Sequence, residues 1–203
     1  MRARSIHVFA AVMVAACSHV VAGAEVAAWT APDPGLLRDA TFDAEQRGER
    51  RAWVYSQHAG QTSYRFNHEP GVLRIERIGP EPWGQASQHL DARPLVGQTL
   101  EFSAELSGRL TDLAERQIAT TGLSARIRGF RAGMPRMLGK AILLRAAGEP
   151  ELSPSATDWT PQSVRFKVPE GATDIDVTIR LGTHGSLSVR GPSLVVVDTT
   201  SDE

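Results

Sequence analysis

The sequence of 203 residues contains a single cysteine, Cys17. One cysteine cannot form a disulfide within the chain, and it cannot build a cysteine-based zinc site. An excess of charge of one sign is also lacking, because 22 Lys and Arg residues stand against 23 Asp and Glu residues. Nucleic-acid-binding proteins usually carry a clear positive excess, so we expect no nucleic-acid partner. A composition of 41% apolar and 22% charged residues excludes a disordered or collagen-like chain.

The N-terminus has no apolar run of the roughly 20 residues that a membrane-spanning helix needs. Its apolar stretch, Ile6–Ala16, is shorter, follows two arginines and precedes small residues. This pattern is typical of a secretory signal, and we expect residues 1–24 to be a signal peptide that is cleaved after Ala24. One alternative is a lipoprotein signal over residues 1–16 with a lipidated Cys17. Another is a buried N-terminal strand or helix.

Either export signal predicts an extracytoplasmic protein. The signal peptide predicts a periplasmic or secreted protein, and the lipoprotein signal predicts one anchored by a lipid. We expect contact with a membrane only through such an anchor.

The chain after the signal is long enough for one domain. Residues 25–39 include the run Ala31-Pro32-Asp33-Pro34-Gly35, which cannot hold a helix or a central strand. We therefore expect a linker or N-terminal flap over 25–39, a β-sandwich domain over 40–198 and a C-terminal tail over 199–203.

Apolar and polar residues alternate in several segments from Trp53 onward, most clearly over 100–106 and 175–181. Such alternation is typical of strands with one buried and one wet face. The spacing of apolar residues over Leu110–Ala119 is helical instead, with Thr111 placed as an N-cap, and it predicts one short helix. Together these segments predict an all-β fold, a β-sandwich of the jelly-roll type.

Several short motifs follow one another in a fixed order between Trp83 and Val197. They are Trp83–Leu90 (WGQASQHL), Leu95–Ala104 (LVGQTLEFSA), Asp158-Trp159, Val164–Ala172 and Ile175-x-Val177. This order resembles the galactose-binding-like jelly rolls, which include many bacterial carbohydrate-binding modules. The segment around His58-Ala59-Gly60 and Tyr64 is similar to exported bacterial proteins of the same fold. The resemblance implies a β-sandwich that binds a carbohydrate.

The resemblance extends less well to the metal site of these modules. Many of them carry paired aspartates in a late strand, and in some the pair is linked to a structural calcium. Here the corresponding stretch, 187–192, has no carboxylate, and none follows before Asp198. We therefore expect no cofactor, and calcium ligands are not evident at this position.

The sequence contains no recognisable catalytic motif. There is no G-x-S-x-G nucleophile elbow, and the six histidines form neither H-x-H nor H-E-x-x-H, so no metal site is predicted. Asp174 and Asp176 share one strand face near Arg180, whereas the two carboxylates of a glycosidase flank the substrate from different elements. We interpret these aspartates as a solvated, charge-balanced strand face. The sequence thus favours a protein that is not an enzyme.

A ligand platform is predicted around Trp83. Sugar rings pack their C–H faces on aromatic planes, and their hydroxyls bond to amides and guanidiniums. If Leu90 faces the core, alternation turns Trp83 and Gln85 to the other surface; the alternative is that Trp83 packs under a loop. The same parity turns Gln88 inward, so Gln88 enters only through the resemblance. The candidate ligand-binding residues are Trp83, Gln85, Gln88, Tyr64, and Arg126 or Arg145.

These features predict an exported, non-catalytic ligand-binding or accessory module of the bacterial cell envelope, with a carbohydrate as its ligand. Two other functions stay open at this point. One is a glycan-active hydrolase that uses scattered carboxylates. The other is a structural or assembly protein whose sandwich binds another envelope protein.

Overall fold

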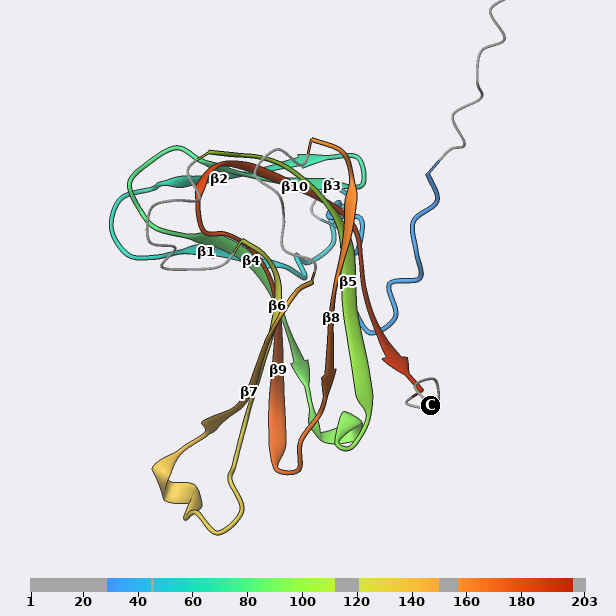
Figure 1. The fold of residues 1–203 in the computed structure, drawn as a ribbon, viewed down its shortest axis with the longest axis vertical. Helices are drawn as coiled ribbons and strands as arrows, with labels where there is room; N and C mark the ends of the chain where they lie inside the picture. Colours follow the sequence, from blue (N-terminus) through green and yellow to red (C-terminus); the bar gives the residue numbers. More distant parts are fainter. Residues whose placement is uncertain (1–28, 45, 112–120, 150–156, 199–203) are drawn as a thin grey trace, which may run out of the picture. The chain divides into compact units, whose positions relative to one another are not determined.

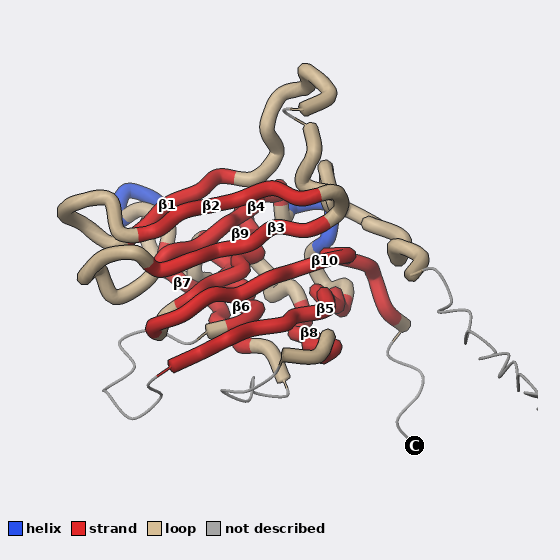
Figure 2. The backbone as a smooth tube through the Cα atoms, turned by 90° about the horizontal axis from the view of Figure 1, so that it is seen from above, coloured by secondary structure: helices blue, strands red, loops and turns tan. Residues whose placement is uncertain are grey.

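The computed structural model describes residues 29–44, 46–111, 121–149 and 157–198. The chain divides into two compact units, 1–30 and 31–203, and all strands belong to the second unit. In the described residues ten strands form two five-stranded antiparallel sheets (Figure 1 and Figure 2). The β9 sheet has the order β1 (Val54–Gln57), β4 (Gly84–Asp91), β9 (Ala172–Leu181), β6 (Gly122–Gly129) and β7 (Ala141–Ala147). The β10 sheet has the order β2 (Tyr64–Glu69), β3 (Val72–Arg77), β10 (His184–Val197), β5 (Thr99–Thr111) and β8 (Thr160–Lys167).

The core lies between alternate residues of the two sheets. On β5 of the β10 sheet, Leu100, Phe102 and Leu106 are fully buried, and on β9 every second residue from Ile175 to Leu181 is fully buried. These side chains belong to one continuous hydrophobic cluster. The period-two pattern of the sequence therefore marks the core-facing residues, and the predicted all-β sandwich of the jelly-roll type is confirmed.

The predicted helix over Leu110–Ala119 is wrong at its N-terminal end. Leu110 and Thr111 are the last residues of β5, and they pair with Gly185 and His184 of β10. Leu110 also continues the alternation of buried residues along β5, so the ladder with β10 outweighs the local helical spacing. Residues 112–120 lie outside the described residues. The helices that the structure does describe are two short 3₁₀ helices, η1 (Arg93–Leu95) and η2 (Arg136–Leu138).

The segment before β1 packs onto the sandwich. Gly35 forms a parallel bridge with Leu194 of β10, and Leu37 and Phe42 are buried in the core. The indole N–H of Trp53 donates a hydrogen bond to the carbonyl of residue 39 at 3.0 Å. The sandwich therefore includes residues on the N-terminal side of position 40.

The predicted export signal over 1–24, the lipidation candidate Cys17 and the predicted tail over 199–203 lie outside the described residues. Across the part of the chain that the structure describes, no helix has the length and apolar character needed to cross a membrane.

Candidate functional site

The outer face of the β9 sheet is lined by polar side chains. Because side chains alternate across a strand, the residues that do not enter the core point to this face. The strand register then sets them in cross-strand rows: Ser56–Gln85–Arg180, Ser87–Thr178–Ser124, His89–Asp176–Arg126–Arg145 and Asp91–Asp174–Arg128.

A pocket of about 370 Å³ opens on this face. We call it the Trp83 pocket. It lies over β4, β9, β6 and β7, and Trp83, the residue before β4, lines one side of it. Its lining consists of Trp83, Gln85, Ser124, Arg126, Arg145, Thr178, Arg180 and three alanines.

Trp83 is half-buried at the edge of the pocket. The His58 ring stands edge-on to its indole, with 5.9 Å between the ring centroids. The guanidinium carbon of Arg180 lies over the indole, 5.4 Å from the ring centroid. A cation this close to an indole face is attracted to it, so Trp83 and Arg180 hold each other in place.

Arg180 comes from the central strand β9 and is partly buried. Its Nε and Nη2 atoms both donate to Oε1 of Gln85, at 3.1 and 2.7 Å. Burial lowers the pKa of the Arg180 guanidinium, and the nearby positive charges of Arg126 and Arg145 lower that pKa further. Among the described residues no carboxylate forms an ion pair with Arg180.

Arg126 of β6 and Arg145 of β7 lie directly opposite each other in the sheet, and both are exposed. Arg126 donates to Oδ2 of Asp176 from Nε at 3.3 Å and from Nη2 at 3.0 Å. Arg145 makes no hydrogen bond or ion pair with any described residue. Like charges placed opposite each other destabilise a sheet. Among the described residues Asp176 balances Arg126, whereas no carboxylate pairs with Arg145.

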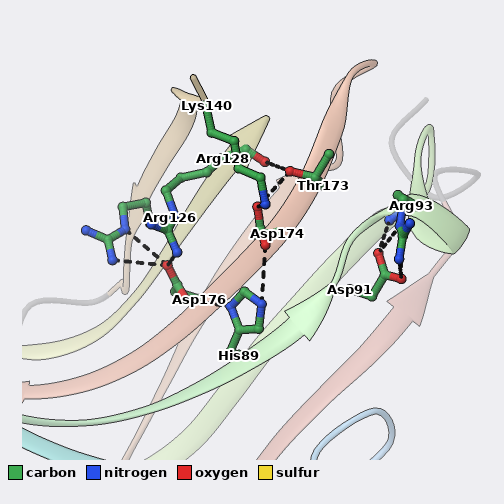
Figure 3. Close-up of polar contacts among 9 residues, drawn as sticks. All are labelled: His89, Asp91, Arg93, Arg126, Arg128, Lys140, Thr173, Asp174 and Asp176. Atoms are coloured by element: carbon green, nitrogen blue, oxygen red, sulfur yellow. Dashed lines mark hydrogen bonds and ion pairs between the residues drawn. The ribbon is translucent and has the colours of Figure 1, made fainter. Parts of the chain in front are cut away.

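A second polar cluster lies further along the same face (Figure 3). The two ring nitrogens of His89 lie 3.3 Å from Asp174 Oδ1 and 3.0 Å from Asp176 Oδ1. Lys140 donates to Asp174 Oδ2 at 2.6 Å, and Arg128 forms an ion pair with Asp176 at 3.4 Å. Both aspartates are therefore paired with cations, which fits a charge-balanced strand face.

The hydrogen bond from Lys140 holds the pKa of the Asp174 carboxyl below its usual value, and a bond from the Thr173 hydroxyl lowers it further. A carboxyl with a lowered pKa is ionised at neutral pH and cannot serve as a general acid there. Within the described residues no group of three or more His, Cys, Asp or Glu side chains is arranged to hold a metal ion.

The structure brings four of the six candidate residues together. Trp83, Gln85, Arg126 and Arg145 all line the Trp83 pocket. Whether they bind a ligand stays a prediction. The sequence left open whether Trp83 is exposed or packs under a loop. In the structure its side chain is half-buried and borders the pocket.

The other two candidates face the core. Tyr64 is 4% exposed, its hydroxyl donates to the carbonyl of Glu81 at 3.1 Å, and burial raises its pKa to about 12. Gln88 is 2% exposed and exchanges two hydrogen bonds with the backbone of Arg38. Their placement as ligand contacts is therefore corrected: Tyr64 packs in the core, and Gln88 ties down the N-terminal segment.

Sequence reasoning missed Arg180, Thr178 and Ser124 as lining residues. Arg180 was expected to balance Asp174 and Asp176, but it bonds to Gln85 instead. The parity of β9 placed Arg180 on the same face as the aspartates, and that signal was available. Which residue lies beside Arg180 on the adjacent strand depends on the strand order, and the local pattern does not contain that order.

No family model matches this chain, and no curated protein matches it. Solved structures with a similar arrangement include a CBM4 module, with 14% identity, a TM-score of 0.47, and coverage of 71% of this chain and 86% of that one. The C-terminal family 22 carbohydrate-binding module of Clostridium thermocellum Xyn10B has 16% identity and a TM-score of 0.43, over 76% of this chain and 91% of that one. The enzymatically active domain of bacteriophage CBA120 tailspike protein 4 has 11% identity and a TM-score of 0.46, over 72% of this chain. The match spans only 19% of the tailspike chain.

Proposed function

We propose that this protein is an exported, non-catalytic saccharide-binding protein whose ligand occupies the Trp83 pocket. The observation that carries the proposal is the composition of the pocket wall. It combines one large aromatic ring with amide, hydroxyl and guanidinium groups from neighbouring strands. A saccharide needs this combination, because its C–H faces are apolar and its edges are lined by hydroxyls.

The size of the pocket supports a short ligand. A volume of about 370 Å³ lies at the low end of the roughly 300–1,000 Å³ that small-molecule sites occupy. Trp83 is the one aromatic residue in its lining, so the pocket offers a single stacking surface. A long polysaccharide chain would need several such surfaces in a row. The pocket therefore suits the end or a short segment of a glycan.

A binding role fits the wall better than a catalytic role. The residues that line the pocket include no Asp, Glu, His or Cys. The hydroxyls of Ser124 and Thr178 have no lining residue that could act as a general base. Asp176, which lies in the same cross-strand row as Arg126 and Arg145, is bound by Arg126, Arg128 and His89.

The N-terminal sequence supports export. Mass spectrometry of the protein purified from its native envelope tests this directly. We expect an N-terminus at Glu25 after cleavage by a signal peptidase. A lipidated N-terminus at Cys17 would instead indicate export as a lipoprotein. An uncleaved protein that begins at Met1 would overturn export.

A glycan array probed with the purified protein tests saccharide binding, followed by calorimetric titration with each glycan that is retained. We expect Trp83→Ala to weaken binding about tenfold or more, because the stacking surface is lost. Trp159→Ala is the matched control. Trp159 is also half-buried, lies next to β8 on the other sheet and has an arginine, Arg190, over its ring at 4.4 Å.

Equal loss of affinity in both tryptophan variants, or a folded wild-type protein that retains no glycan, would overturn the proposed function. The melting temperature of each variant is recorded beside its affinity. This separates a loss of contact from a loss of fold.

A further inference from the structure

The Trp83 pocket carries an unbalanced positive charge. Three arginines, Arg126, Arg145 and Arg180, line it, and no acidic residue is part of the lining. Asp176 pairs with Arg126 from the edge of the pocket, but it also pairs with Arg128. Its single negative charge is thus shared between two cations. Arg145 and Arg180 form no ion pair with any described carboxylate.

Two arginines of the other sheet are neutralised. On the outer face of the β10 sheet Arg165 donates to Glu101 at 2.8 Å, and Arg190 donates to Glu105 at 2.5 Å. In these two cases an acidic residue of β5 lies within reach of the arginine. At the pocket the residue opposite Arg145 is another arginine, and the partner of Arg180 is a neutral amide. The arrangement leaves cations facing one another where a ligand would enter.

The geometry of these cations suits an anion. A guanidinium has five N–H donors, and two parallel donors match the two oxygens of a carboxylate or the oxygens of a sulfate. Arg180 uses two of its donors on Gln85, which also fixes its orientation, and leaves three for a ligand. Arg145 has all of its donors available to a ligand as far as the described residues are concerned. Arg126 and Arg145 repel the Arg180 guanidinium, and a bound negative charge would relieve that repulsion.

We infer that the saccharide taken by the Trp83 pocket is acidic, and that Arg145 and Arg180 bind its carboxylate or sulfate group while its ring packs beside Trp83. This inference rests on the proposed function. It narrows the ligand to sugars such as hexuronates or sulfated hexoses, whose shared chemistry is an anionic group on a polyhydroxylated ring.

The test uses ligand pairs that share one sugar backbone and differ in whether the anionic group is present or masked. The carboxylate arm compares oligogalacturonides and glucuronate-substituted xylo-oligosaccharides with their methyl-esterified forms. The sulfate arm compares sulfated galactan oligosaccharides with their desulfated forms. Calorimetric titration of the purified protein is run at about 50 mM and again at about 500 mM salt. We expect the charged member of one arm to bind at least tenfold more tightly, and the difference to shrink at high salt.

The variants separate a specific contact from general attraction. Arg145→Gln and Arg180→Gln should each weaken binding of the charged ligand about ten- to hundredfold. Arg145→Gln should weaken binding of the neutral ligand far less, because the neutral ligand lacks the anionic group that Arg145 binds. Arg165→Gln is the control, because it removes one positive charge from an exposed position on the other sheet. Arg145 is exposed, so Arg145→Gln should fold like the wild type. That variant tests the inference even if Arg180→Gln fails to fold.

Each result decides between the two proposals. Preference for a charged glycan that is lost in Arg145→Gln but kept in Arg165→Gln supports both. A charged glycan that binds no more tightly than its neutral counterpart, and with equal affinity to the wild type and to Arg145→Gln, overturns the acidic ligand and leaves saccharide binding standing. Equal weakening by all three arginine variants also overturns the inference, since it indicates unspecific charge attraction. A folded protein that binds neither charged nor neutral glycans overturns the proposed function itself.

Discussion

Replacing Gln88 by leucine should destabilise the protein and leave ligand binding unchanged. Gln88 points into the core and is 2% exposed. Its Oε1 accepts a hydrogen bond from the Arg38 backbone N–H at 3.1 Å, and its Nε2 donates to the Arg38 carbonyl at 2.6 Å. Leucine has a similar size but no polar atoms. The change therefore removes both bonds and leaves two partly buried backbone groups without these partners.

The expected cost follows from those two bonds. A typical hydrogen bond contributes about 1 kcal/mol net, and a buried group left without a partner costs about 1–3 kcal/mol. Gln88→Leu should thus lower the free energy of unfolding by about 2–4 kcal/mol. For a domain of this size, 1 kcal/mol shifts the melting temperature by roughly 2–4 °C, so the melting temperature should fall by roughly 4–16 °C.

Thermal unfolding, hydrogen exchange and glycan titration together distinguish this from a binding role. Thermal unfolding gives the shift in melting temperature, and hydrogen exchange should show faster exchange at the Arg38 amide. Ser87→Ala is the control on the same strand, because Ser87 points to the outer face and its hydroxyl makes one long contact, 3.4 Å, to the carbonyl of Val54. That variant should change stability by less than about 0.5 kcal/mol. An unchanged melting temperature together with lost glycan binding in Gln88→Leu would refute the reasoning.

Three further predictions concern groups around the site. The lowered pKa of Asp174 means that its ion pair with Lys140 stabilises the protein fully above the ordinary carboxyl pKa of 3.8 and is lost as the pH falls through the lowered value. The melting temperature should therefore decrease less steeply from about pH 7 to pH 2 for Asp174→Asn than for the wild type. An identical pH dependence of the two melting temperatures would contradict this. Gly84→Ala should lower the free energy of unfolding by about 1–3 kcal/mol in chemical denaturation, because a Cβ at Gly84 would overlap the ring of buried Tyr64. An unchanged free energy of unfolding would show that the ring can move aside. Tyr64→Phe should cost about 1 kcal/mol through the lost bond to the Glu81 carbonyl, and a change in glycan affinity at unchanged stability would return Tyr64 to the binding site.

On β4 and β9 the local pattern of the sequence was sufficient to predict which side of the strand a residue occupies. On β9 the alternation from Ile175 to Leu181 marked the buried residues, and around β4 the parity set by Leu90 turned Gln85 outward and Gln88 inward. This works because side chains of a strand alternate with a fixed period of two, which depends only on neighbouring residues. The same parity argued against Gln88 as a ligand contact, which the family resemblance alone had suggested.

The composition of the pocket was decided by the tertiary structure. Arg126 meets Arg145 because β6 pairs with β7, and Arg180 meets Gln85 because β9 pairs with β4, across 95 positions of the sequence. The burial of Tyr64 and the bond between Gln88 and Arg38 likewise join segments far apart in the chain. Strand order and register arise from packing two sheets around one core, and alternation is the same whichever strands become neighbours. The sequence therefore determined the face on which the candidate side chains stand, whereas only the strand pairing determined which of them meet in one pocket with their charges unbalanced.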